Sequence, residues 1–196
     1  MAENLIPIFP LNTVLFPEGP LPLRIFEPRY LEMVSECLRA GTGFGVCLIV
    51  SGTEVGAAPE INEQGTLAHI TDWHQRNDGL LGITATGIQR FRIISRRLRP
   101  NRLMEADVEL VDNEPPIDLP AEYIPLTDLL RQLIKQVPDL FQGLTIKYGD
   151  AGWVSNRLAE LLPMPLEEKQ QLLETHEPME RLARLRVIMD RMNIQF

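Results

Sequence analysis

The first 112 residues contain apolar stretches of the length of β-strands, separated by turn residues. The stretches are LIPIF (5–9), TVLF (13–16), LPLRIF (21–26), FGVCLIV (44–50), GTLAHITDW (65–73), GLLGITATG (79–87), IQRFRIISRRL (88–98) and RLMEADVELVD (102–112). Prolines lie within or close to the first three, and because proline cannot donate to a sheet ladder, these strands should be short, irregular or at an edge. Six or more strands with one helix among them predict a closed or nearly closed barrel, since closure removes exposed edges.

The one helical pattern in this half is EPRYLEMVSECLRAG, residues 27–41. Its apolar residues recur at helical spacing and predict one buried face, made of Tyr30, Leu31, Val34, Cys37 and Leu38. Pro28 suits the first helical turn, where its missing N–H would have no partner, and Gly41 suits the position just after the end. The segment therefore reads as the junction at which a strand turns into a helix.

After residue 112 the pattern changes from strands to helices. DNEPPIDLP (112–120) combines acidic residues with three prolines and is the best candidate for a linker. Amphipathic helical patterns follow at 124–137, 151–163, 166–174 and 177–192, with short proline-containing connections that indicate a small bundle. We therefore expect an α+β chain, with a mostly antiparallel barrel over residues 1–114 and a helical bundle over residues 115–196.

Charge narrows the classes of function. The chain carries 19 Lys and Arg against 27 Asp and Glu, a formal charge of −8, and the excess is about −4 in each half (10 against 14 in residues 1–112, 9 against 13 in residues 113–196). This disfavours general binding to nucleic acid or anionic membranes, which needs a cationic surface. The start of the chain lacks a signal-peptide pattern, so we expect a cytoplasmic protein without a membrane segment.

A search for catalytic chemistry finds no usable pattern. The sequence has no Gly-Lys dipeptide and so no P-loop, and its three histidines lack the spacing of a metal motif. Cys37 and Cys47 stand in apolar contexts that favour small buried thiols. We expect no catalytic residue, no cofactor and no bound metal.

One segment concentrates positive charge, with six arginines between Arg90 and Arg102. Arginine forks bind phosphate and stack on bases, so Arg96, Arg97 and Arg99 could contact RNA. The other interpretation is a solvated strand face balanced across the sheet by Glu105, Asp107 and Glu109. The net charge of the chain favours the second interpretation.

Several pieces occur in an order and spacing typical of a known family: IPIFPLNTVLFPEGPLPLRIFEPRYLEMV, GFGVCLI, EVG, GTLAHI and GIQRFRI, and later VSNRLAELLPMPLEEKQQLLETHEPMERLARL. The sequence resembles the amino-terminal substrate-binding domain of ATP-dependent Lon proteases over nearly its whole length. The resemblance implies a PUA-like β-barrel joined to a helical bundle, and a role in recognising protein substrates. A Lon protease continues into ATPase and Ser-Lys peptidase modules, and this sequence ends at Phe196 with neither, so only recognition is carried over.

These observations lead to the hypothesis of a non-enzymatic recognition module that binds unfolded or extended polypeptide, or a partner protein. Binding would use an apolar groove with a few polar groups, or the addition of a peptide strand to an irregular sheet edge. The candidate contacts are Arg24, Arg29 and Tyr30 at the strand–helix junction, and Trp73 in the following β region. RNA binding through the PUA-like barrel and the Arg90–Arg102 segment is the alternative. We expect a monomer or a weak homodimer.

Overall fold

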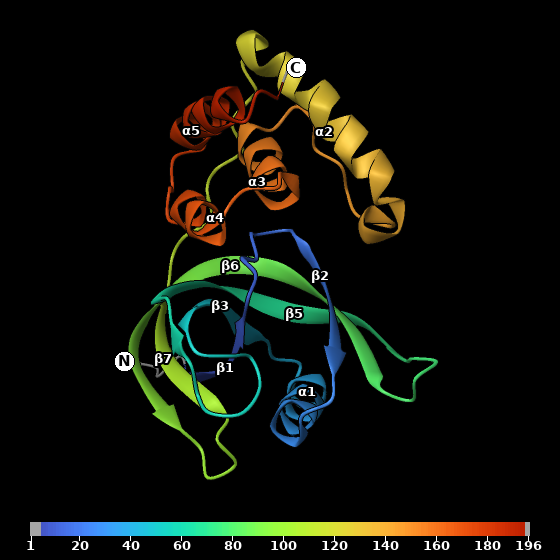
Figure 1. The fold of residues 1–196 in the computed structure, drawn as a ribbon, viewed down its shortest axis with the longest axis vertical. Coiled ribbons are helices and arrows are strands. Elements are labelled where there is room, and N and C mark those ends of the chain that lie inside the picture. The colour runs from blue at the N-terminus through green and yellow to red at the C-terminus, as the bar shows by residue number, and fades with distance from the viewer. Residues whose placement is uncertain (1–4, 195–196) are drawn as a thin grey trace. The chain divides into compact units, whose positions relative to one another are not determined.

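The chain divides into two compact units, Met1–Asn113 and Glu114–Phe196. The structure is a computed structural model that describes residues 5–194 (Figure 1). The first unit is a β-sheet domain with one helix, and the second unit consists of helices. Each unit is described by itself below.

The first unit is a barrel of mostly antiparallel strands. The strands are β1 (Leu5–Leu11), β2 (Pro20–Ile25), β3 (Phe44–Ser51), β4 (Glu60–Ile61), β5 (Gln64–Gln75), β6 (Leu81–Leu98) and β7 (Met104–Leu110). The sheet order is β1-β7-β6-β5-β3-β4, and a parallel pairing of β1 with β3 closes five of the strands into a ring. Strand β2 pairs with β6 outside this ring, at residues 81–86. The predicted mostly antiparallel barrel is confirmed.

Strand β6 differs from the prediction, because the stretches 79–87 and 88–98 are one continuous strand. Gly87 lies within it, where the Phe16 carbonyl approaches so closely that a Cβ at residue 87 would lie 2.3 Å from the oxygen. The predicted strand at 13–16 is also wrong: this segment is irregular, and its Phe16 carbonyl makes the close approach to β6. The sequence pattern places Gly87 at a turn, whereas in the structure its missing side chain leaves room for the segment that contains Phe16 to cross β6.

The buried apolar residues of the barrel form two clusters on opposite faces of its strands. Ile8 belongs to one cluster and its neighbour Phe9 to the other, as expected from the alternation of side chains along a strand. Helix α1 (Pro28–Ala40) packs on the cluster that contains Phe9. Both cysteines are buried free thiols, and burial raises their pKa, as expected for structural rather than reactive cysteines.

Helix α1 has the predicted ends and a different buried face. Pro28 occupies the first turn, and Gly41 ends the helix in the left-handed conformation at φ 64°. Leu31 and Leu38, expected to be buried, are exposed, whereas Met33 is fully buried. The buried stripe is thus rotated from the predicted one toward Met33.

The second unit contains the helices expected from the pattern. They are α2 (Ile124–Gln136), α3 (Ala151–Leu161), α4 (Leu166–Leu173) and α5 (Pro178–Arg191), with short 3-10 helices η1 (Ala121–Tyr123) and η2 (Pro138–Phe141). Asp150 caps α3 by accepting a hydrogen bond from the Trp153 backbone N–H. Among the described residues, no helix has the length and apolar character needed to cross a membrane.

Candidate functional site

A cavity of about 280 Å³ opens where β2 meets α1. Its buried walls are apolar and come from Phe9 and Leu11 of β1, Ile25 of β2 and Tyr30 of α1. Phe26 and Val55 stand at its opening, and both side chains are about half exposed. The cavity therefore joins a buried apolar surface to exposed apolar side chains.

Aromatic stacking fixes the inner wall of this cavity. The rings of Phe9 and Tyr30 stack with their centroids 4.0 Å apart, and the Arg29 guanidinium lies 4.7 Å from the centroid of the Tyr30 ring. Burial is the main cause that raises the pKa of Tyr30 to about 12. The phenol is therefore neutral near pH 7 and is able to donate a hydrogen bond.

Arg29 does not line the cavity, but it contacts residues that do. It is 7% exposed and forms a 2.9 Å ion pair with Glu27. It also donates hydrogen bonds to the backbone carbonyls of Glu54 and Arg102, at 3.4 and 3.3 Å. A buried arginine with these partners positions neighbouring segments, so its predicted role as a direct peptide contact is not what the geometry favours.

The loop between β3 and β4 completes the cavity. Gly52 and Gly56 adopt positive φ angles of 101° and 96°, and the residues between them include Glu54 and Val55, which line the cavity. The Glu54 carboxylate accepts a 2.6 Å hydrogen bond from the backbone N–H of Asn12, just after β1. This contact ties the loop to the barrel.

Of the remaining sequence candidates, Arg24 and Tyr30 line the cavity and Trp73 does not. The Arg24 side chain is 56% exposed and lies 3.5 Å from Asp78. Trp73 lies in β5, opposite Ile83 of β6, and is 62% exposed. Leu23 of β2 lies opposite Ile83 on the other side of β6. Trp73 is therefore two strand spacings, about 10 Å, from the strand that lines the cavity.

Phe26, Glu54 and Val55 were not among the sequence candidates. Phe26 is the last residue of the predicted strand 21–26, and its position directly before the charged Glu27 was the one available signal. Glu54 and Val55 belong to the EVG piece of the family resemblance, but no pattern indicated their contribution to a cavity, because it depends on a contact with Asn12, about forty residues earlier. Within residues 5–194 no group of acidic, histidine or cysteine side chains is arranged to hold a metal ion.

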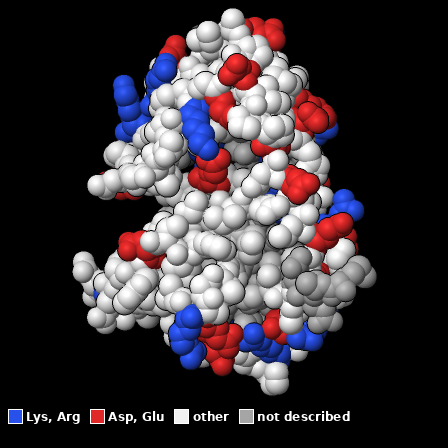
Figure 2. Space-filling view, turned by 180° about the vertical axis from the view of Figure 1, so that it is seen from behind, with Lys and Arg blue, Asp and Glu red and all other residues white. Residues whose placement is uncertain are grey.

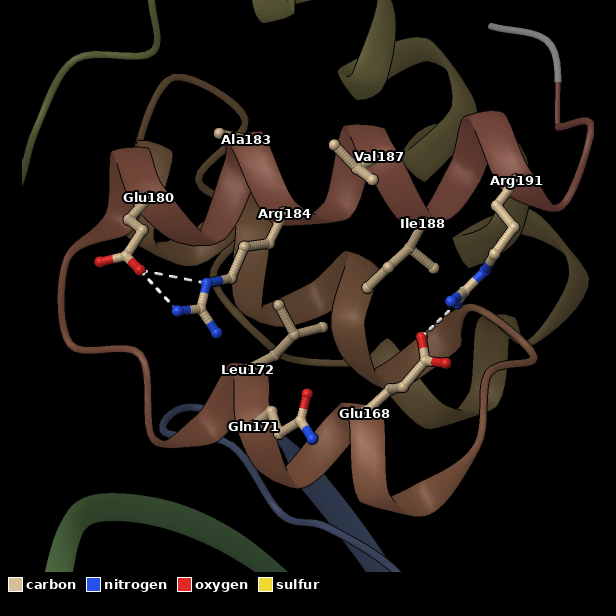
Figure 3. Close-up of a pocket in the computed structure, with 9 residues that line it drawn as sticks. All are labelled: Glu168, Gln171, Leu172, Glu180, Ala183, Arg184, Val187, Ile188 and Arg191. Carbon is tan, nitrogen blue, oxygen red and sulfur yellow. Dashed lines mark hydrogen bonds and ion pairs between the residues drawn. The ribbon is translucent and has the colours of Figure 1, made fainter.

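A second concave surface lies between α4 and α5 in the helical unit (Figure 3). It has a volume of about 700 Å³, and Leu172, Val187 and Ile188 form its apolar part. Ion pairs stand at its two ends, Glu180 with Arg184 at 2.7 Å and Glu168 with Arg191 (Figure 3). This groove is more exposed than the barrel cavity, since only one of its nine lining residues is buried, against four of eleven in the barrel cavity.

Two arginines of the arginine segment form ion pairs with acidic side chains. Arg97 pairs with Glu105 across the sheet at 3.1 Å, and Arg99 pairs with Glu105 and Glu36 at 2.9 and 2.8 Å. The cross-strand balance expected from the sequence is confirmed for Glu105. On the face seen in Figure 2, basic side chains of the described residues are scattered among acidic ones.

Comparison with known proteins agrees with this fold. The family model for the ATP-dependent protease La (LON) substrate-binding domain matches residues 5–191, and the chain belongs to this family. It is similar to the crystal structure of a Lon N-terminal domain protein from Xanthomonas campestris, with a TM-score of 0.77 and 34% identity, covering 94% of this chain and 98% of that one. The N-terminal domain of a Mycobacterium avium complex Lon protease, at 17% identity and a TM-score of 0.60 over 95% and 97% of the two chains, shares the fold.

Two curated relatives of this chain are named as Lon proteases. The chain is 26% identical to a Lon protease of Anaeromyxobacter dehalogenans, with 96% of this chain and 23% of that protein covered. It is 28% identical to a Lon protease 2 of Herpetosiphon aurantiacus, with 94% and 23% covered. The chain thus spans about a quarter of the length of these relatives, in the part that corresponds to the substrate-binding domain.

Proposed function

We propose that this chain is a non-catalytic recognition module that binds unfolded or extended polypeptide in the cavity between β2 and α1. The observation that carries the proposal is the apolar cavity itself, with Phe26 and Val55 exposed at its opening. An apolar side chain that leaves water for such a cavity gains about 25 cal/mol for each Å² buried. Membership of the Lon substrate-binding family supports a polypeptide as the ligand.

The polar groups at the cavity suit recognition better than catalysis. Glu27 is paired with Arg29, and one oxygen of Glu54 is engaged with the Asn12 backbone. Neither carboxylate has a neighbouring nucleophile among the described lining residues, since the only hydroxyl there is the Tyr30 phenol with its raised pKa. These groups are able to orient a chain without reacting with it.

The test is binding of a reduced, carboxymethylated model polypeptide, followed by fluorescence anisotropy up to tens of micromolar. The double variant Phe26→Ala, Val55→Ala should weaken binding by about tenfold or more, because exposed apolar anchors of this kind contribute about 1 to 2 kcal/mol each. Ile94→Ala is the matched control, since Ile94 belongs to the same unit, is 60% exposed and lies outside the cavity. No binding by the wild-type protein in this range would refute the proposal.

A further inference from the structure

The cavity runs along the edge of β2 rather than along one of its faces. Six consecutive residues, from Pro22 to Glu27, line it, and the first four of them belong to β2. Side chains of neighbouring strand residues point to opposite faces of a sheet, so a cavity on one face would contact only every second residue. A cavity that contacts all four strand residues follows the strand's margin, where the backbone is also exposed.

This edge of β2 has no strand partner among the described residues. β2 pairs only with β6, in an uninterrupted antiparallel register from Pro20 opposite Thr86 to Ile25 opposite Leu81. Figure 1 shows β2 at the margin of the sheet. The exposed Pro22 and Arg24 lie on this strand, which leaves the margin open to solvent.

The hydrogen bonds that precede β2 show which backbone groups point outward. The Gly87 N–H donates to the Gly19 carbonyl at 2.9 Å, so residue 19 is turned toward β6. Orientation alternates along an antiparallel strand, and Leu21, Leu23 and Ile25 are therefore turned toward β6 as well. Pro20, Pro22 and Arg24 are turned outward, which agrees with the two prolines having no N–H to give to the ladder.

The outer edge consequently presents one donor and several acceptors. Arg24 offers its N–H and its carbonyl, whereas Pro22 offers a carbonyl alone. An added antiparallel strand would exchange two hydrogen bonds with Arg24 and donate a third to the Pro22 carbonyl. The residue between these two bonding positions would lie opposite Leu23, a side chain that packs on the cluster containing Phe9 and Tyr30.

The charges at the cavity restrict what flanks this central residue. Glu27 and Glu54 are the acidic lining residues, and Arg24 is the basic one, which already has Asp78 at 3.5 Å. Glu27 has Arg29 as its partner and Arg24 shares Asp78 with Arg76, so Glu54 is the lining charge that is paired with no basic side chain among the described residues. A cationic neighbour is favoured by this arrangement and an anionic one is repelled.

We propose that β2 binds its ligand by strand addition: an extended segment pairs through its backbone with Arg24 and Pro22 and inserts one apolar side chain, flanked by basic residues, into the cavity. The inference rests on the proposed function and specifies the ligand class of that same site. Main-chain pairing gives such a site tolerance of sequence, and the cavity restricts it to segments with an apolar residue at the central position.

The probe is a labelled peptide, Ser-Lys-Thr-Phe-Thr-Lys-Ser, and a set in which single residues are N-methylated. N-methylation of either Thr beside Phe should weaken binding about tenfold or more, because it removes a bonding N–H and adds a methyl group at the interface. N-methylation of Phe should have little effect, because its N–H points away from β2. Replacement of both Lys by Glu should also weaken binding.

The matching change in the protein is Arg24→Pro, compared with Arg24→Gln. Both remove the guanidinium, and only the proline removes the outward N–H while leaving the ladder to β6 intact. Arg24→Pro should weaken binding about fivefold or more beyond Arg24→Gln. Circular dichroism establishes whether the proline variant is folded, and the N-methylated peptides decide the question if it is not.

Three outcomes count against the inference in different ways. Binding that ignores the position of N-methylation overturns strand addition and leaves polypeptide recognition standing. Absence of binding to both the peptide and the unfolded polypeptide overturns the proposed function, and this inference with it. A wild-type dimer that Arg24→Pro converts into a monomer would show that the edge pairs with a second copy instead.

Discussion

Arg181 and Glu114 form a two-point ion pair that ties the first residue of the helical unit to α5. Nη1 of Arg181 lies 2.8 Å from Oε1 of Glu114, and Nη2 lies 2.6 Å from Oε2. Arg181 is completely buried, and it also donates to the Ser155 hydroxyl and to the Thr175 carbonyl. One guanidinium thereby joins the linker, α3, the connection after α4, and α5.

Glu114→Ala should destabilise the helical unit by about 3 kcal/mol, because it leaves a buried guanidinium without its counter-charge. Urea unfolding followed by fluorescence of the buried Trp153 measures the change. Glu180→Ala is the matched control, since Glu180 and Arg184 form an exposed pair on the same helix that should contribute less than about 1 kcal/mol. Equal effects of the two variants would contradict this account of the buried pair.

Tyr30 should make the stability of the barrel sensitive to alkaline pH. The pKa of its phenol is raised to about 12 in the folded chain, from 10 for a free phenol, chiefly by burial. Below pH 10 the phenol is protonated in both states; between pH 10 and about 12 only the unfolded state loses the proton, so stability falls as pH rises. The loss amounts to at most about 3 kcal/mol.

Tyr30→Phe should abolish this part of the alkaline loss. Urea midpoints at pH 9 and pH 11.5 compare the variant with the wild type, and absorbance at 295 nm follows phenolate formation directly. If the urea midpoints of the wild type and the variant differ by the same amount at both pH values, Tyr30 ionises at its ordinary pKa in the folded chain.

Gly87→Ala should weaken the attachment of β2 to β6. A Cβ at residue 87 would lie 2.3 Å from the Phe16 carbonyl oxygen, where backbone rather than a flexible side chain must move. We expect a loss of about 2 kcal/mol or more and, as a result, weaker peptide binding. Gly149→Ala is the control, because a Cβ there has no described neighbour within 4 Å. Thermal unfolding and the peptide assay measure the two effects.

The arginine segment should not support salt-sensitive RNA binding. Arg97 and Arg99 already hold acidic partners, and a phosphate would have to compete with Glu105 and Glu36. We expect no binding of a structured RNA at micromolar protein in 50 mM salt. Binding that is lost with Arg96→Glu and Arg97→Glu would instead support the RNA alternative.

Local signals in the sequence were enough to predict the ends of a helix whose ends depend on nearby residues. Pro28 and Gly41 fix the ends of α1 through their own backbone preferences, and the structure confirms both. The buried face of α1 was not predictable in the same way, because Met33 is buried by contacts with residues from distant strands. Pattern alone favoured the leucines at 31 and 38, which remain exposed.

The cavity was predictable only in part for the same reason. Arg24 and Tyr30 stand within the strand–helix junction that the sequence marks, and both line the cavity. Arg29 is in the same stretch, but its burial follows from carbonyls of Glu54 and Arg102, which are remote in sequence. Residue spacing cannot indicate which of two neighbouring arginines meets such partners.

The prolines of β2 also disfavour pairing between the β2 edges of two copies of this chain. An open strand margin normally invites the same margin of another copy, which is how ordered aggregates begin. Two β2 edges placed together would bring carbonyl against carbonyl wherever Pro20 or Pro22 stands, with the Arg24 N–H as the sole outward donor that the described part of each strand offers. A ligand with a full set of N–H groups has no such deficit, so this edge is able to accept a foreign chain and still discourage the growth of fibrils.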